Sequence, residues 1–209
     1  MENKKPSSSF FVTVYILGAL ISVTLAVLAT WGDIEAAFYG FDRRASTRLP
    51  GLRCPILMNR NETGVVSVRI SNTTDRKLSP SVKAEFSARI TPTSTLDSIP
   101  LEPGESRIVE WTVGPENVDL GRFIFSKVLV FASYPIPDRE TTCGAFIIDL
   151  PVRGNALVVL MIVLGAAGMG GGLYFLNRSR PLTQRAETAL RPLTFLAIII
   201  ALALVASLM

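Results

Sequence analysis

The chain has 209 residues, of which 49% are hydrophobic, and a formal net charge of +4. This length leaves room for one domain of ordinary size beside membrane segments, and the apolar content exceeds what a soluble domain needs. Histidine is absent, which excludes a Ser-His-Asp or Cys-His catalytic arrangement within the chain, and also blue copper in its usual form. We therefore expect no enzyme activity, no catalytic residues, no metal site and no cofactor.

Residues 10–31 form an uncharged apolar run that predicts the first membrane span, after a short tail at residues 1–9. At about 1.5 Å per residue, such a run crosses a hydrocarbon core about 30 Å thick. It is longer than the apolar core of a cleaved signal peptide, which has about 7–15 residues, so we expect an uncleaved signal anchor. The alternative is a signal peptide cleaved after Val27-Leu28-Ala29.

Residues 32–53 link this span to the next part of the chain, and we expect residues 33–41 to form a short interfacial helix. Aromatic residues follow the span, as they do in the belts that anchor helices at membrane interfaces; they are Trp31, Phe38, Tyr39 and Phe41. Asp42-Arg43-Arg44 and Arg48 could contact lipid headgroups. The alternative is a tether packed on the domain that follows.

Residues 54–153 carry the pattern of β-strands. Apolar and polar side chains alternate from Val82 to Ile90, which indicates a strand with one buried and one exposed face. The segment from Arg122 to Tyr134 is apolar on both faces and predicts a central strand covered on both sides. Shorter alternating runs at 66–70 and 109–113 predict further strands, and residues 146–148 supply the last one. Strands separated by polar turns predict an antiparallel immunoglobulin-like or fibronectin-like sandwich, with a small β-barrel as the alternative.

Part of this domain resembles bacterial Ig-like modules of the CARDB or NEW3 type. The resemblance rests on Gly64 to Ser71 with the polar turn after it, on Leu101-Glu102-Pro103-Gly104-Glu105-Ser106, and on Trp111-Thr112-Val113. In such modules a strand ends in Asn, and a "PGES"-like turn later precedes a strand ending in "TV". The resemblance covers about half of the domain. It implies a spacer or binding scaffold with no shared catalytic residues.

The two cysteines, Cys54 and Cys143, predict one disulfide across the β domain. In the chain-entropy model, a disulfide that closes a loop of about 90 residues stabilises the folded state by on the order of 4–5 kcal/mol. The alternative is two unrelated buried thiols. Asn61-Glu62-Thr63 and Asn72-Thr73-Thr74 also fit the acceptor pattern for N-glycosylation.

Residues 155–176 and 193–209 predict the second and third membrane spans. The third has no polar face, which argues against the alternative of an interfacial helix. Small residues four apart let helix backbones approach closely. They are Gly18, Ser22 and Ala26 in the first span, Gly168 and Gly172 in the second, and Ala197 and Ala201 in the third. These faces predict either packing within the chain or docking on the helices of other subunits.

Short basic segments predict the topology. The tail holds Lys4 and Lys5, the loop 177–191 holds Arg178, Arg180, Arg185 and Arg191, and the stretch between the first two spans has 15 basic and 15 acidic residues. Because short basic segments stay cytoplasmic, we expect the β domain on the extracytoplasmic side, most simply of the plasma membrane. The positive charge is then a topology signal, and we expect no nucleic-acid partner.

Together these features predict an α + β membrane protein with three transmembrane helices and an extracytoplasmic all-β Ig-like sandwich between the first and second. Helices that can pack closely, beside a neutral β domain, favour a non-catalytic accessory subunit of a larger membrane complex. Its partners would be membrane lipids and other integral membrane subunits. One alternative is a surface binding or adhesion module that uses the loop from Thr91 to Pro100. A further alternative is an assembly factor for a membrane complex.

Overall fold

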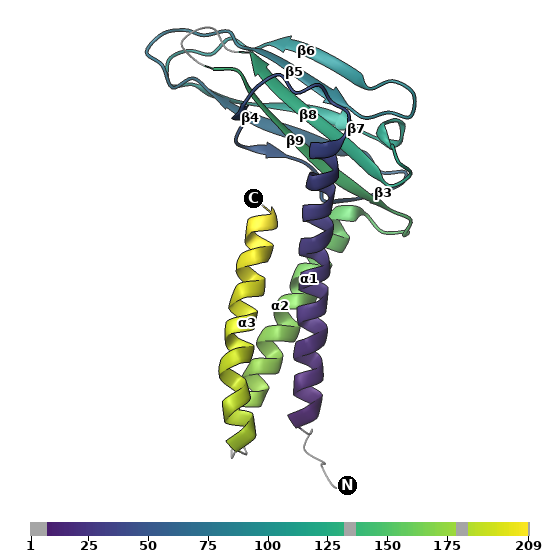
Figure 1. Cartoon of the computed structure of the whole chain (residues 1–209), viewed down its shortest axis with the longest axis vertical. Helices are drawn as coiled ribbons and strands as arrows, with labels where there is room; N and C mark the ends of the chain where they lie inside the picture. Colours follow the sequence, from purple (N-terminus) through teal and green to yellow (C-terminus); the bar gives the residue numbers. More distant parts are fainter. Residues whose placement is uncertain (1–7, 132–136, 179–183, 209) are drawn as a thin grey trace. The chain divides into compact units, whose positions relative to one another are not determined.

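The computed structural model describes residues 8–131, 137–178 and 184–208. Within these residues it is an α+β chain with three long helices and nine β-strands (Figure 1). The chain divides into two compact units: a helical unit of Met1–Leu28 with Ala156–Met209, and a β unit of Ala29–Asn155. The β unit thus takes in the end of the first helix and the linker, beyond the residues 54–153 that the strand pattern marks out.

The three helices are α1 (Ser8–Phe38), α2 (Gly154–Arg178) and α3 (Gln184–Leu208). Each is long and apolar enough to span a membrane. α1 is continuous through residues 33–38, so most of the segment expected as a separate interfacial helix is the end of α1. Burial explains this, because Gly32 and Ala36, which follow the apolar run, are buried at helical spacing from the buried Ala29 within it.

α3 begins nine residues before the expected span. Its first turns, from Gln184 to Leu190, are rich in residues with good helix propensity, although they are too polar to be marked by an apolar pattern. The apolar window in α3 is Leu190–Ser207. Much of the basic loop expected at residues 177–191 is therefore helical.

The β unit contains two sheets, ordered β1-β9-β8-β5-β6, with β3 also paired to β9, and β2-β4-β7. The strands are β1 (Thr47–Arg48), β2 (Leu52–Arg53), β3 (Leu57–Asn59), β4 (Gly64–Ser71), β5 (Ser81–Phe86), β6 (Thr93–Ser98), β7 (Ser106–Val113), β8 (Phe123–Phe131) and β9 (Arg139–Ile148). Pairs are antiparallel except β1–β9 and β3–β9, which are parallel. Two separate sheets fit the expected sandwich.

The inner faces of both sheets form one apolar core, as the alternating pattern predicted. Buried residues from six strands meet there, among them Val68 of β4, Val82 of β5, Trp111 of β7 and Val128 of β8. The expected strand from Val82 to Ile90 is wrong at its end, because β5 stops at Phe86 and Ile90 is 96% exposed. Ser87 turns the chain away, donating from its hydroxyl to the Asn117 carbonyl and accepting from the Phe125 N–H.

β8 is buried on both faces, which confirms the prediction of a covered central strand over its described residues. Its inner side chains, such as Val128, belong to the sandwich core. Its outer side chains, Phe123 and Phe125, pack in a second cluster with Ala36 of α1 and with Tyr39 and Phe41. The second cover is therefore the end of the first helix and the segment that follows it. Residues 132–134 of the expected strand lie outside the described part of the chain.

Candidate functional site

The C-terminal end of α1 packs on the outer face of the larger sheet. Gly32 and Gly144 meet backbone to backbone, so that a Cβ added at Gly32 would lie 2.7 Å from the Gly144 carbonyl oxygen. The Asp33 carboxylate accepts a hydrogen bond of 3.2 Å from the Gly144 N–H. Ala36 is fully buried one turn later. The helix end is thus fixed by contacts that leave no room for a side chain at either glycine.

Tyr39 fastens the segment that leaves the helix. Its ring centroid lies 4.5 Å from that of Phe125 and 4.8 Å from that of Phe41. Its hydroxyl donates a 2.6 Å hydrogen bond to an Asp119 carboxylate oxygen. Burial, together with the hydrogen bond to Asp119 and the charge of that carboxylate, raises the pKa of Tyr39 to about 12. The hydroxyl therefore remains a donor at neutral pH.

Residues 39–48, here called the strap, run over β8 and β9 and end in β1. Lys127, whose side chain is 3% exposed, donates from Nζ to the Asp42 carbonyl. Glu140 accepts a 2.9 Å hydrogen bond from the Arg44 N–H. The strap is therefore packed on the domain, which is the tether alternative given for this segment in the sequence analysis. The Arg43 side chain nevertheless remains 92% exposed.

A buried ion cluster lies beneath the strap. Lys127 Nζ is 3.3 Å from Glu140 Oε2 and 3.8 Å from Glu85 Oε2. Burial by itself would raise the pKa of Glu140. Hydrogen bonds from the N–H groups of Arg44 and Ala45, together with Lys127, outweigh burial and hold the pKa below its ordinary value of 4.5. Since the folded chain lowers this pKa, the ionised form of Glu140 stabilises the fold.

We expect the Glu140→Gln variant to be destabilised by about 2 kcal/mol at neutral pH, because Lys127 then keeps only Glu85 as a buried counter-charge. The stabilisation from Glu140 is fully present above about pH 4.5 and is lost as the pH falls through the lower folded pKa. The variant should therefore lose less stability than the wild type on acidification. Free energies of unfolding measured from about pH 6 to about pH 3 check both effects.

Glu102→Gln is the matched control for this prediction, because Glu102 pairs with Lys77 at a site where both side chains are 61% exposed. Exposed pairs of this kind contribute little. A Glu140→Gln variant that behaves like Glu102→Gln would contradict a stabilising role for the ion cluster.

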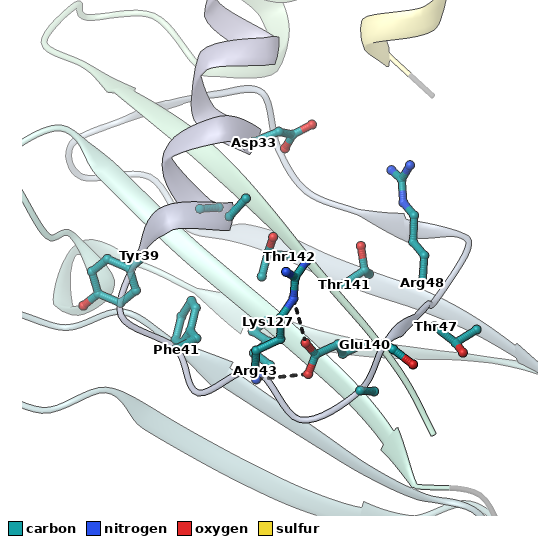
Figure 2. Close-up of a pocket in the computed structure, with 14 residues that line it drawn as sticks. Asp33, Tyr39, Phe41, Arg43, Thr47, Arg48, Lys127, Glu140, Thr141 and Thr142 are labelled. Carbon is teal, nitrogen blue, oxygen red and sulfur yellow. Dashed lines mark ion pairs between the residues drawn. The ribbon is translucent and has the colours of Figure 1, made fainter. Parts of the chain in front are cut away.

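A cavity of about 370 Å³ opens between the strap, the end of α1 and β9 (Figure 2). Its charged lining residues are Asp33, Arg43, Arg48, Lys127 and Glu140. Figure 2 shows the Lys127–Glu140 pair at one end of the lining and the Asp33 and Arg48 side chains at the other. Lys127 and Glu140 already bind each other, so the charged groups left to face a small polar ligand belong to the other three residues.

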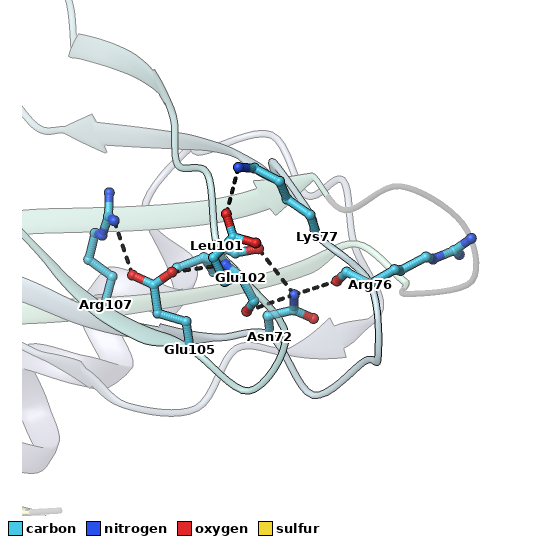
Figure 3. Close-up of polar contacts among 7 residues, drawn as sticks. All are labelled: Asn72, Arg76, Lys77, Leu101, Glu102, Glu105 and Arg107. Atoms are coloured by element: carbon cyan, nitrogen blue, oxygen red, sulfur yellow. Dashed lines mark hydrogen bonds and ion pairs between the residues drawn. The ribbon is translucent and has the colours of Figure 1, made fainter.

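A second polar cluster joins two turns of the sandwich (Figure 3). The Asn72 amide nitrogen donates to the carbonyls of Arg76, Leu101 and Glu102 at 2.7, 3.2 and 3.1 Å. Its side-chain oxygen accepts from the N–H and hydroxyl of Thr74 at 3.0 and 2.7 Å. Asn72 is 2% exposed, so its amide is committed to the fold and is not an accessible glycosylation acceptor.

The same cluster unites the motifs that carry the CARDB-type resemblance. The N–H of Asn72, just after β4, donates to the Glu105 carbonyl at 2.9 Å, and the Gly104 N–H donates to the Asn72 carbonyl at 3.0 Å. Gly104 has a φ of +74°, a conformation that favours glycine. The strand-ending Asn and the Pro-Gly-Glu-Ser turn are therefore one structural unit.

Replacing Asn72 by alanine is expected to destabilise the β unit by about 2–3 kcal/mol, because the hydrogen bonds from the buried Asn72 amide to three backbone carbonyls are lost. Unfolding of the full chain in detergent, followed by the fluorescence of the buried Trp111, measures the loss. Asn61→Ala, at the exposed acceptor of the other pattern, should change stability by less than about 0.5 kcal/mol. Equal stability of the two variants would show that the Asn72 contacts contribute nothing net.

The structure joins Cys54 and Cys143 in a disulfide, with their Cα atoms 6.1 Å apart. Cys54 lies between β2 and β3, where the chain passes from the smaller sheet to the larger one, and Cys143 lies in β9. β1 and β3 pair with β9 on either side of Cys143 along the strand. The disulfide therefore attaches the segment between β2 and β3 to β9, at a point on β9 between its pairings with β1 and β3.

The small residues of α1 and α2 pack against each other inside the helical unit. A Cβ at Gly18 would lie 2.8 Å from the Gly168 Cα, and a Cβ at Gly172 would lie 2.8 Å from the Tyr15 Cβ. Ser22 is buried, and its hydroxyl donates to the Gly18 carbonyl at 3.0 Å. Packing within the chain thus accounts for these four positions.

The other predicted packing positions are less enclosed. Ala26 is half-buried, Ala197 packs beside a small cluster of Tyr15, Met169 and Ile200, and Ala201 is exposed. α3 is also tied to α1 by the Tyr15 hydroxyl, which donates to the Leu193 carbonyl at 2.7 Å.

Two of the predicted topology residues have described side chains. Arg178 donates to the Tyr174 hydroxyl at 2.9 Å, and Arg191 is exposed near the start of the apolar window in α3. The other four, Lys4, Lys5, Arg180 and the side chain of Arg185, lie outside the described residues.

The sequence contained one signal for the strap and its ion cluster that the strand pattern alone did not use. Lys127 is the single charge in the apolar strand Phe123–Phe131. A strand covered on both sides cannot bury a lysine without a counter-charge and a covering segment. This residue therefore called for an acidic partner, which is Glu140 on the neighbouring strand.

No model of a known protein family and no curated protein matches the chain. Solved structures do match it. The CARDB domain of the PF1109 protein from Pyrococcus furiosus, solved in complex with di-metal ions, is a structural neighbour with a TM-score of 0.38 and 13% identity. That match covers 48% of this chain and 91% of the other. No group of three or more His, Cys, Asp or Glu side chains that could hold a metal ion occurs in the described parts of this chain.

Parts of two carbohydrate-active enzymes also match. One is the β-glucosidase EmGH1 from Erythrobacter marinus, with a TM-score of 0.34 and 20% identity over 47% of this chain. The other is a Paenibacillus cycloisomaltooligosaccharide glucanotransferase, with a TM-score of 0.37 and 11% identity over 50% of this chain. This chain spans only 15% and 14% of the length of these enzymes. Matches of this extent do not assign either enzymatic activity to this chain.

Proposed function

We propose that the chain is a non-catalytic accessory subunit of a larger membrane complex, inserted through its three helices. The observation that carries the proposal is a second small-residue face on α2. Ala166 and Gly170 are exposed, and a Cβ at Gly170 or Gly171 would have no atom within 4 Å. The face that packs on α1 uses Gly165, Gly168 and Gly172 instead. A helix with a second open small-residue face can accept a further helix at close range.

α3 adds to the surface available for partners. It carries large exposed side chains on several sides; Phe195, Ile199 and Leu202 are 67%, 61% and 64% exposed. Both lipid and neighbouring helices can cover such a surface, and the proposal assigns part of it to other integral membrane subunits. The basic residues around α2 and α3 support placing the loop between them in the cytoplasm and the β unit outside, most simply at the plasma membrane.

We propose that the sandwich braces a partner on the outer side. Its connection to α1 supports this role, because the helix runs into the β unit with no extended linker and ends packed on the larger sheet. The adhesion alternative relies on a different segment of the sandwich. The segment expected as a recognition loop, Thr91 to Pro100, contains β6, which is paired with β5 over its whole length.

Site-specific crosslinking tests this proposal. A photo-reactive residue replaces Gly170 on the open face, and the matched control carries it at Met169, which is 8% exposed inside the helical unit. In membranes, the Gly170 position should form one or two discrete adducts with other proteins, and the Met169 position should form none. Lipid adducts alone at Gly170 would contradict a partner helix on this face.

A further inference from the structure

We propose that the cavity between the strap and β9 binds a phosphate ester. In this site the guanidinium groups of Arg48 and Arg43 hold the phosphate oxygens, and the Asp33 carboxylate accepts a hydrogen bond from a donor next to the phosphate. The proposal does not depend on whether the chain belongs to a larger assembly.

The residues assigned to the ligand still have unused hydrogen-bonding groups. Within the described parts of the chain, the Arg48 side chain interacts with Asp33 through charge alone and makes no hydrogen bond or ion pair. Arg43 approaches Glu140 only through Nε, at 3.8 Å, which leaves its terminal nitrogens free to donate. One Asp33 oxygen accepts from the Gly144 N–H. The other Asp33 oxygen can accept from a ligand.

The charges of the lining match a phosphate diester. Three cationic and two acidic residues line the cavity, which gives an excess of one positive charge. Lys127 and Glu140 neutralise each other at one end, so the excess lies with Arg43 and Arg48. A phosphate diester carries one negative charge, and the planar fork of arginine donors fits its oxygens. Thr142 lines the same cavity and offers a hydroxyl group.

Size and position favour a phospholipid headgroup as the source of the phosphate. At about 370 Å³, the cavity is at the small end of the range for ligand pockets, about 300–1,000 Å³. Asp33 lies two residues after Trp31, where the apolar run ends, which is about 3 Å along the helix axis. Aromatic residues at such positions mark the level of the headgroups. With the proposed insertion of α1 in the membrane, the site lies at the depth where lipid phosphates occur.

The Asp33 carboxylate should also select among headgroups. Ethanolamine and glycerol present an N–H or O–H next to the phosphate, whereas the quaternary nitrogen of choline has no hydrogen to donate. We expect phosphatidylethanolamine and phosphatidylglycerol to bind at least about tenfold more tightly than phosphatidylcholine, since one hydrogen bond to a charged group accounts for such a factor.

Lipid titration of the full-length protein in detergent micelles tests the proposal, with the shift in unfolding temperature as the readout. The variants are Arg48→Gln and the control Arg53→Gln, which removes an exposed arginine of β2 that does not line the cavity. Arg48→Gln should weaken phosphatidylglycerol binding about tenfold, and Arg53→Gln should leave it unchanged. The unfolding temperature without added lipid shows that both variants fold.

A second arm replaces the lipid with soluble glycerol 3-phosphate to identify the source of the phosphate. Binding of lipid alone, dependent on Arg48, supports a headgroup site. Binding of glycerol 3-phosphate with the same dependence supports a site for a soluble phosphate ester. Equal affinities of wild type and Arg48→Gln, or equal losses in Arg48→Gln and Arg53→Gln, would overturn the proposal. Equal affinity for phosphatidylcholine would overturn the role of Asp33.

Discussion

Replacing Gly144 by valine is expected to release the end of α1 from the larger sheet and to destabilise the β unit by about 3 kcal/mol or more. A Cβ at this position would overlap the carbonyl oxygen of Gly32 and lie 2.5 Å from its carbonyl carbon. Both atoms belong to the backbone of a helix, so they cannot move aside as a flexible side chain would. Overpacking that moves backbone costs about 1–3 kcal/mol and sometimes more.

Denaturant unfolding of the full chain in detergent measures the loss, and the fluorescence of Trp31 reports on the helix end. The Trp31 ring centroid lies 6.1 Å from that of Phe123 and 6.2 Å from that of Phe146, so detachment should change its emission. Gly40→Val is the matched control, because a Cβ at Gly40 would have no atom within 4 Å. Equal stability of the two variants would contradict the close contact between α1 and β9.

Removing the disulfide should have an effect of similar size. The bridge joins residues 89 apart in sequence, and the chain-entropy model assigns about 4–5 kcal/mol to a loop of this length. We expect the double variant Cys54→Ala, Cys143→Ala to lose about this much stability to urea. The wild type with reductant should behave like the double variant, and the double variant should not respond to reductant. A loss below about 1 kcal/mol would contradict a stabilising bridge.

Strand alternation predicted the sandwich core because it depends on which side chains avoid water. Val82, Ala84 and Phe86 alternate and are buried together. The pattern failed at Ile90, because the hydrogen bonds of Ser87 end the strand and no local rule reveals them. β6 was missed for a related reason. It is an edge strand with all six residues exposed, so it lacks the apolar positions that mark a strand.

The helices were predicted from apolar runs, which mark the part of a helix that is suited to lipid and not the whole helix. α1 continues to Phe38 because Gly32 and Ala36 are small enough for the helix to pack on a sheet far along the chain. Small-residue spacing located the contact between Gly18 and Gly168, although it could not distinguish the face that packs within the chain from the one that stays open at Gly170.

The cavity could not be predicted from sequence, because it forms only when three segments meet. Asp33, Arg48 and Glu140 are separated by up to about a hundred residues and are brought together by the pairing of β1 with β9. The headgroup contact expected for Arg43 and Arg48 is local in sequence, whereas the acceptor and the walls of the site come from the fold. Lys127 was the one residue whose type alone indicated such a covering segment, because it is a charged residue in a strand that is otherwise apolar.

Native mass spectrometry of the chain extracted in a mild detergent tests the central claim most directly. We predict an assembly well above the 22.7 kDa of the single chain, containing at least one other integral membrane protein. Substituting leucine at Gly170, which fills the open face of α2, should release the chain from that assembly without unfolding it. A lone 22.7 kDa chain in the wild-type extract, carrying only lipid and detergent, would contradict the account.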